Sequence, residues 1–192
     1  MKSRIIKHLS DSGLGLERGT VALVSYNSLW AEAFDFLQAE VAQVVKPFHI
    51  DIEHVGSTAI VGCLAKPILD ILIVFEAGRD FADETKGLAQ LGFLAKGPYG
   101  IPGRHYFNFY SDNGSIEYTH IHAYPRGHAD IAQQILFRDR LRDSADLMQQ
   151  YSALKRSLLE AGISRKDYPA AKTDFVEIVL NSKRENGGVD GT

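Results

Sequence analysis

The segment IEHVGSTAIVGCLAKPILDILIVF, residues 52–75, joins a small-residue turn to an apolar strand. Gly56 and Ser57 form the turn, and Asp70 follows thirteen residues after Ser57. The run 71–75 after Asp70 predicts a buried strand, where an unpaired aspartate is costly. A phosphate-and-metal site would explain this arrangement. A turn followed by a core strand with a capping acid is the simpler alternative.

The composition is that of one soluble globular domain. The chain has 192 residues, of which 45% are hydrophobic and 23% are charged, and this is enough to bury a core. The net charge of −3 argues against a broad nucleic-acid surface. Cys63 is the single cysteine, so no intrachain disulfide can form. Neither a signal peptide nor a membrane-spanning stretch is recognisable, so we expect a cytoplasmic protein without a membrane partner.

Hydrophobic periodicity predicts an α+β fold. Two aromatic runs, 104–110 and 116–124, flank an Asp-Asn-Gly turn and predict an antiparallel hairpin. We expect His120 and His122 to lie on the hairpin face toward Asp70. Further strands are predicted at 20–26, 48–55 and 68–75, and helices at 30–45, 80–91, 130–142, 147–160 and 169–183.

The predicted architecture is a mixed or antiparallel sheet of about four to five strands, with packed helices and a helical C-terminal third. Residues 1–18 are polar and contain glycine, which predicts a flexible N-terminal arm. A single domain is expected over 19–184, followed by a flexible tail at 185–192.

Common nucleotide and metal motifs do not describe the opening segment. A P-loop needs four residues between its glycines, followed by Lys and Ser or Thr. Here five residues separate Gly56 from Gly62, and Cys63 follows. HExxH and CxxC patterns are also absent.

The order of an apolar residue, Gly, Ser, and then an Asp that opens a strand is instead the signature of the nucleotidyltransferase fold. Within that superfamily the chain resembles the GrpB proteins over residues 20–183. The segments that carry the resemblance are the opening segment, LVSYNSLW (23–30), PGRHYF (102–107), THIHAY (119–124), LFRDRLR (136–142), YSALKRSL (151–158) and YPAAKTDFVEIVL (168–180).

The resemblance implies a nucleotidyltransferase-like mixed sheet and Mg²⁺-dependent nucleotidyl or phosphoryl transfer to an unknown acceptor. It implies a nucleotide or another phosphorylated small molecule as the ligand. GrpB domains are sometimes fused to dephospho-coenzyme A kinase, which by resemblance alone suggests a link to coenzyme A biosynthesis.

By the same resemblance, Gly56 and Ser57 match the phosphate-cradling pair, and Asp70 matches the first metal carboxylate. Two carboxylates at positions i and i+2 of a strand would share one face and bind metals together. The second position, however, holds Leu72. The usual two-metal arrangement therefore cannot form from this strand.

Other residues could complete the site. Glu117 is the first candidate for the missing catalytic carboxylate and Glu53 the second. His120 and His122 share a strand face and could hold a transition metal, or Mg²⁺ less well, together with Asp70. Alternatively, the two histidines could hydrogen-bond neighbouring strands.

Three basic residues are candidates for substrate binding, namely Lys66, Arg104 and His54. In the simpler alternatives, Lys66 is a solvated lysine before a proline, and Arg104 forms an ion pair on the hairpin.

Three functions are compatible with these residues. The first is an Mg²⁺-dependent nucleotidyl or phosphoryl transferase. The second is a non-catalytic module that binds a nucleotide or a phosphometabolite. The third is a metal-dependent hydrolase that uses His120, His122 and Asp70. Leu72 favours the second function over the first, whereas the many polar residues around the inferred cleft keep the first and third open. In all three, Gly56, Ser57 and Asp70 should converge on one concave site.

Overall fold

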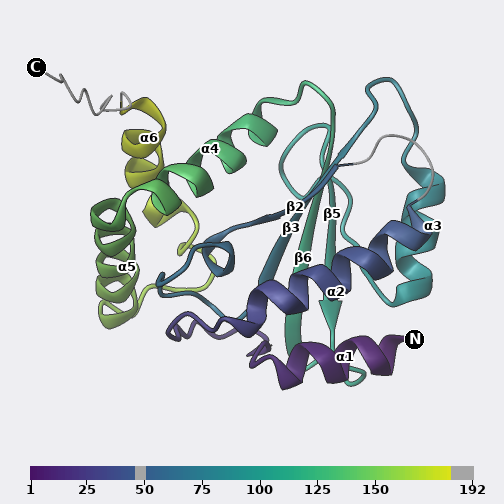
Figure 1. Ribbon diagram of the computed structural model, residues 1–192, viewed down its shortest axis with the longest axis horizontal. Coiled ribbons are helices and arrows are strands. Elements are labelled where there is room, and N and C mark those ends of the chain that lie inside the picture. The colour runs from purple at the N-terminus through teal and green to yellow at the C-terminus, as the bar shows by residue number, and fades with distance from the viewer. Residues whose placement is uncertain (46–50, 183–192) are drawn as a thin grey trace, which may run out of the picture.

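A mixed β-sheet forms the centre of the computed structural model, which describes residues 1–45 and 51–182 (Figure 1). Five strands are hydrogen-bonded in the order β2-β3-β6-β5-β4, and β1 pairs with β6. β3 and β6 run parallel, whereas the other pairs are antiparallel. The strands are β1 Leu16–Glu17, β2 Asp51–Val55, β3 Leu69–Phe75, β4 Leu94–Ala95, β5 His105–Tyr110 and β6 Ile116–Pro125. The predicted mixed sheet and the antiparallel hairpin are confirmed.

The helices gather in two groups, α1–α3 beside the sheet and α4–α6 at the other side of the molecule (Figure 1). The helices are α1 Lys2–Asp11, α2 Leu29–Val44, α3 Ala82–Leu91, α4 Ala129–Asp143, α5 Ala145–Glu160 and α6 Thr173–Asn181. Four of the predicted helices are confirmed to within two residues at each end. The fifth, predicted over 169–183, begins with the 3-10 turn η2, Ala170–Lys172, before α6.

One face of the sheet and the helices α1–α3 enclose the main apolar core. Because side chains alternate along a strand, Ile71 and Ile73 of β3 point to this face together with Phe107 of β5. Trp30 and Leu37 of α2 pack against them and are fully buried. This face therefore holds α2 firmly on the strands.

The opposite face of the sheet is only partly apolar. A small cluster of buried residues beneath α4 is formed by Val55, Leu72, Val74 and Tyr124. Leu72 is fully buried, and Ile131 and Ile135 of α4 pack on this cluster. The position at which a second metal carboxylate would stand therefore serves the packing of α4.

The helical C-terminal third has its own apolar cluster. Leu141, Tyr151 and Val179 pack there with Ile60 and Cys63. Because Ile60 and Cys63 come directly after the Gly-Ser turn, this cluster ties α4, α5 and α6 to the turn.

The flexible arm predicted for residues 1–18 is wrong for most of its length. Residues 2–11 form α1, whose Ile5 and Leu9 are fully buried in the main core. These two residues are four apart and share one helix face. The many polar residues of this segment lie on the remaining faces and hid the apolar pair.

The strand predicted at 20–26 is also wrong. Within it only Val24 pairs, through an isolated antiparallel bridge with Ala65. A β-branched run needs a neighbouring strand to form a ladder, and among the described residues this segment pairs with another strand only at this bridge. Of the strand predicted at 48–55, residues 51–55 form β2, whereas 48–50 and the predicted tail at 185–192 lie outside the described residues.

Among the residues that the structure describes, none of the helices combines the length and the apolar character needed to cross a bilayer.

The turn after β2 passes very close to β3. Gly56 has φ +71°, and the 3-10 turn η1, Ser57–Ala59, follows it. A Cβ atom on Gly56 would lie 2.4 Å from Oδ2 of Asp70. A glycine is therefore required here both by the backbone conformation and by the approach to Asp70.

Replacing Gly56 with alanine should destabilise the fold more than the same change at Gly78. Both glycines have positive φ, at +71° and +79°, but a Cβ at Gly78 would meet nothing within 4 Å. Strain alone should cost Gly78→Ala about 1 kcal/mol. Gly56→Ala should lose roughly 2 kcal/mol more, because its methyl group collides with Asp70. Urea unfolding of both variants measures the difference, and equal losses would contradict the close approach.

Candidate functional site

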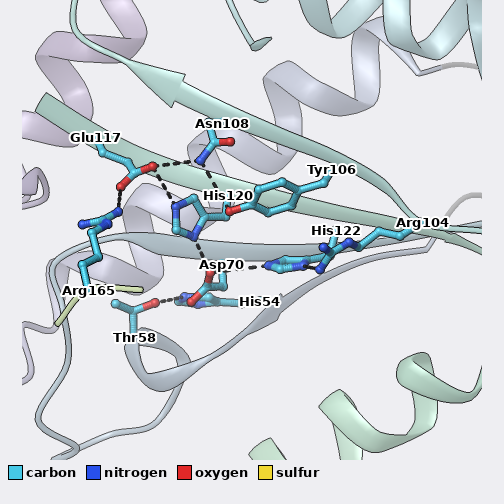
Figure 2. A network of polar contacts seen from close by, with 10 residues as sticks. All are labelled: His54, Thr58, Asp70, Arg104, Tyr106, Asn108, Glu117, His120, His122 and Arg165. Carbon is cyan, nitrogen blue, oxygen red and sulfur yellow. Dashed lines mark hydrogen bonds and ion pairs between the residues drawn. The ribbon is translucent and has the colours of Figure 1, made fainter. Parts of the chain in front are cut away.

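Figure 2 shows a network of polar side chains, most of them carried by the neighbouring strands β3, β5 and β6. The parallel register of β3 and β6 places Asp70 beside His120 and Leu72 beside His122. On β5, Tyr106 pairs with His122. The two histidines therefore lie on the face toward Asp70, as the alternation of β6 predicted.

Asp70 is the centre of this network. Its Oδ1 lies 3.1 Å from Nδ1 of His120 and 3.7 Å from Nε2 of His122. One ligand atom from each of these three residues lies within 4.8 Å of the other two. The side chain of Asp70 is 30% exposed, compared with 13% for His120 and 19% for His122. The carboxylate is therefore the most open of the three groups.

Glu117 reaches the network because β6 is irregular. Tyr110 pairs with Glu117 while Phe109 pairs with Thr119, so Tyr118 is an additional residue in β6. This β-bulge puts Glu117 on the same face as His120 although they are three residues apart. Oε1 of Glu117 lies 3.1 Å from Nε2 of His120. His120 therefore stands between two carboxylates.

Two further residues fix the carboxylate of Glu117. Asn108 of β5 donates a 2.8 Å hydrogen bond to Oε1, and Arg165 forms an ion pair with Oε2. Glu117 therefore touches the far side of His120 and does not join Asp70 directly. Within residues 1–45 and 51–182, the clustered ligand atoms belong to Asp70, His120 and His122, and include neither Glu117 nor Glu53.

The network fixes the charges of the two carboxylates. Burial raises the pKa of Asp70, but the hydrogen bond with His120 and the interaction with the nearby His122 outweigh this and hold it below its usual range. Burial likewise raises the pKa of Glu117, but His120 and Arg165 lower it to about 2. Both residues are therefore carboxylates at neutral pH.

The pKa values of the two histidines are shifted in opposite directions. Burial lowers the pKa of His120, but its hydrogen bonds with Asp70 and Glu117 give a net upward shift. For His122, burial prevails over the interaction with Asp70 and lowers the pKa. A proton on His120 thus offsets the two carboxylates, whereas His122 is neutral.

A buried lysine of α5 holds the Gly-Ser turn. Nζ of Lys155 donates to Oγ of Ser57 at 2.9 Å, to the backbone oxygen of Leu64, and to Sγ of Cys63 at 3.2 Å. The residue is 2% exposed, and burial lowers its pKa to about 8. Ser57 is therefore positioned by the helical third.

Lys66 and Lys172 lie beside the same aromatic ring. Their Nζ atoms are 5.2 and 4.7 Å from the centroid of Tyr168. Burial lowers the pKa of both lysines, and the negative charge of Asp70 opposes this shift, so both ammonium groups lie within its electrostatic reach. Each also lowers the pKa of Lys155 by repulsion. We call Lys66, Lys155 and Lys172 the lysine cluster.

The lysine cluster lacks acidic partners in the described part of the chain. None of the ion pairs formed there includes any of its three members. The cluster therefore concentrates positive charge next to the Gly-Ser turn and Asp70, although the whole chain carries a net charge of −3.

The remaining predicted site residues have other contacts. Glu53 accepts a 2.7 Å hydrogen bond from Arg138 of α4 and lines a separate hollow of about 330 Å³. His54 stacks on Phe34 and its Nε2 lies 3.0 Å from Oγ1 of Thr58. Burial lowers the pKa of His54 to about 4, so its ring is neutral.

Arg104 stabilises its own loop. It donates to the backbone oxygens of Pro98 and Tyr99, and its guanidinium lies 4.8 Å from the ring centroid of Tyr106. Its Nη1 is 3.5 Å from Nδ1 of His122. Arg104 therefore touches the edge of the network, although not through the ion pair considered as its simpler role.

Sequence reasoning missed Lys155, Lys172 and Arg165. Both lysines lie in segments that carry the family resemblance. YSALKRSL contains Lys155, and YPAAKTDFVEIVL contains Lys172. Arg165 lies between these segments and gave no such signal.

A family model described as "GrpB protein" matches residues 20–182. The UPF0157 protein YqkA of Bacillus subtilis is 38% identical over 173 residues, which are 88% of this chain and 49% of YqkA. The chain thus spans about half the length of that relative.

Two solved structures were also similar. The conserved protein GrpB from Enterococcus faecalis matches with a TM-score of 0.74 and 26% identity, over 82% of this chain and 94% of that chain. The Cid1 poly(U) polymerase matches with a TM-score of 0.47 and 11% identity, over 77% of this chain and 44% of that chain. From the extent of the family match and the shared fold, we conclude that this chain belongs to the GrpB protein family.

Proposed function

We propose that this chain binds a phosphorylated small molecule, with a nucleotide as the first candidate, and acts on its phosphate at Asp70. The lysine cluster is the observation that carries the proposal. Three ammonium groups without acidic partners in the described chain repel one another, and their burial disfavours the charged form of each. A ligand with several negative charges would relieve both costs.

The neighbouring turn suits the same ligand. The oxygen of Ser57 accepts a hydrogen bond from Lys155, so the hydroxyl hydrogen points away from that lysine. Because Gly56 has no side chain, the turn approaches Asp70 closely. A small turn of this kind lets backbone N–H groups approach phosphate oxygens. The phosphates would therefore lie between η1 and the lysine cluster, and the reacting end would face Asp70.

The chemistry suggested by this placement is nucleotidyl or phosphoryl transfer. Positioned ammonium groups stabilise the charge that develops on the phosphoryl oxygens. The Asp70 carboxylate, held ionised and 30% exposed, could accept a hydrogen bond from an attacking hydroxyl group and so orient it toward the phosphorus. If that hydroxyl group belongs to water, the same arrangement performs hydrolysis, which the adjacent pair His120 and His122 favours. Leu72 supports the remaining candidate, a module that binds the ligand without catalysis.

Lys172→Met should weaken binding of ADP or pyrophosphate at least tenfold, because a charge-assisted hydrogen bond contributes about 1.5–3 kcal/mol. Lys166→Met is the matched control. Lys166 is exposed six residues earlier in the chain and carries the same charge. Calorimetric titration of the parent and both variants measures the change. Equal losses in both variants, or no loss in either, would remove the lysine cluster from the phosphate site.

Asp70→Asn should abolish turnover of a bound nucleotide while leaving its dissociation constant within about threefold of the parent, because the lysine cluster is retained. Product formation is followed by phosphorus NMR, and binding by thermal shift. Retained turnover in the variant would exclude Asp70 as the reacting group. Nucleotide binding without turnover in the parent would favour the binding module.

A further inference from the structure

The metal implied by the superfamily resemblance does not fit this site. Mg²⁺ prefers oxygen ligands in octahedral geometry, usually one or two carboxylates together with phosphates and water. The site offers one carboxylate, Asp70, and two imidazoles. Leu72 is fully buried in the cluster beneath α4 and supplies no oxygen. Among the described residues, Glu117 and Glu53 are not in the group of clustered ligand atoms.

We propose that Asp70, His120 and His122 bind a divalent transition-metal ion of the zinc class in preference to Mg²⁺. Two imidazoles and a carboxylate are typical ligands of zinc and of neighbouring transition metals. This inference does not depend on the proposed phosphate ligand, because it concerns the metal and these side chains alone.

The distances suit a small ion. Ligand bonds of about 2.0–2.1 Å in tetrahedral geometry place the ligand atoms roughly 3.3 Å apart. Oδ1 of Asp70 lies 3.1 Å from Nδ1 of His120 and 3.7 Å from Nε2 of His122, on either side of that separation. The ligand atoms come from the neighbouring strands β3 and β6 and all lie within 4.8 Å of one another, so the two imidazoles need to approach each other by at most about 1.5 Å to reach tetrahedral separation.

The surroundings of His120 give an independent argument. A metal-binding histidine usually donates its second ring N–H to a carboxylate, which fixes its tautomer and orientation. Glu117 lies 3.1 Å from Nε2 of His120, so Nδ1 faces Asp70 and would release its proton to solvent when the ion binds. Asn108 and Arg165 hold Glu117 in turn. The β-bulge at Tyr118 thus positions a carboxylate behind the proposed ligand.

Metal binding through His122 has one structural cost. If Nε2 coordinates the ion, Nδ1 carries the proton, and the contact with Arg104 must be given up. That contact is 3.5 Å, at the outer limit of a hydrogen bond. Arg104 keeps its hydrogen bonds to Pro98 and Tyr99, so the loop that carries it need not move.

The test uses the full chain stripped with a chelator and then titrated with Zn²⁺, Co²⁺ or Mg²⁺ alone. We expect one Zn²⁺ per chain, bound at least a thousandfold more tightly than Mg²⁺. His122→Gln should weaken Zn²⁺ binding more than tenfold, and Glu117→Gln should weaken it roughly tenfold or more. His105→Gln is the matched control, because His105 is also a strand histidine but contacts Phe75 and Phe81 in place of Asp70.

The metal environment is read directly from the parent chain, so the test does not depend on variants that fold. X-ray absorption of the zinc-loaded parent should show scattering from two imidazoles, and excess Mg²⁺ should leave it unchanged. The proposal is overturned if Zn²⁺ binds no more tightly than Mg²⁺, if fewer than two imidazoles are seen, or if folded His122→Gln binds Zn²⁺ as the parent does.

Discussion

The parallel pairing of β3 with β6 is the constraint on which the candidate site depends. It places Asp70 beside His120 and, two residues on, Leu72 beside His122. The same pairing sends Ile71 and Ile73 into the core under α2, so the polar face is fixed by the packing of the apolar face. A register shift of one residue would bury Asp70 in the core and expose Ile71. The apolar core therefore maintains the geometry of the polar network.

We propose that the helical C-terminal third has a functional role as well as a structural one. Lys155 of α5 reaches the Gly-Ser turn, and Lys172 of η2 lies with Lys66 beside Tyr168. The apolar cluster around Tyr151 anchors α5 next to the turn. The sheet thus contributes the carboxylate and the imidazoles, and the helices contribute two members of the lysine cluster. We propose that phosphate and metal sites meet where these two halves face each other.

Much of the fold followed from local patterns in the sequence. The helices were predicted because their apolar spacing is regular over several turns, and the hairpin 104–124 because two aromatic runs flank an Asp-Asn-Gly turn. The main errors have physical causes: α1 has only two fully buried apolar residues, and the run 20–26 found a single partner at Ala65. The convergence of His120 and His122 on Asp70 was predictable from strand alternation. The position of Glu117 was not, because it depends on an extra residue in β6. Lys172 was unrecognised because Asp70 and Lys66, which give it a role in the site, are distant in sequence.

The central claim is that Asp70, the two histidines and the lysine cluster form a single site for a metal ion and a phosphorylated ligand. The most direct measurement is a crystal structure of the chain grown with Zn²⁺ and ADP, with anomalous diffraction collected at the zinc edge. We predict one zinc peak bound to Asp70, His120 and His122, with the ADP phosphates against Ser57 and Lys172. Zinc bound away from these residues, or phosphates bound away from the lysine cluster, would contradict the account.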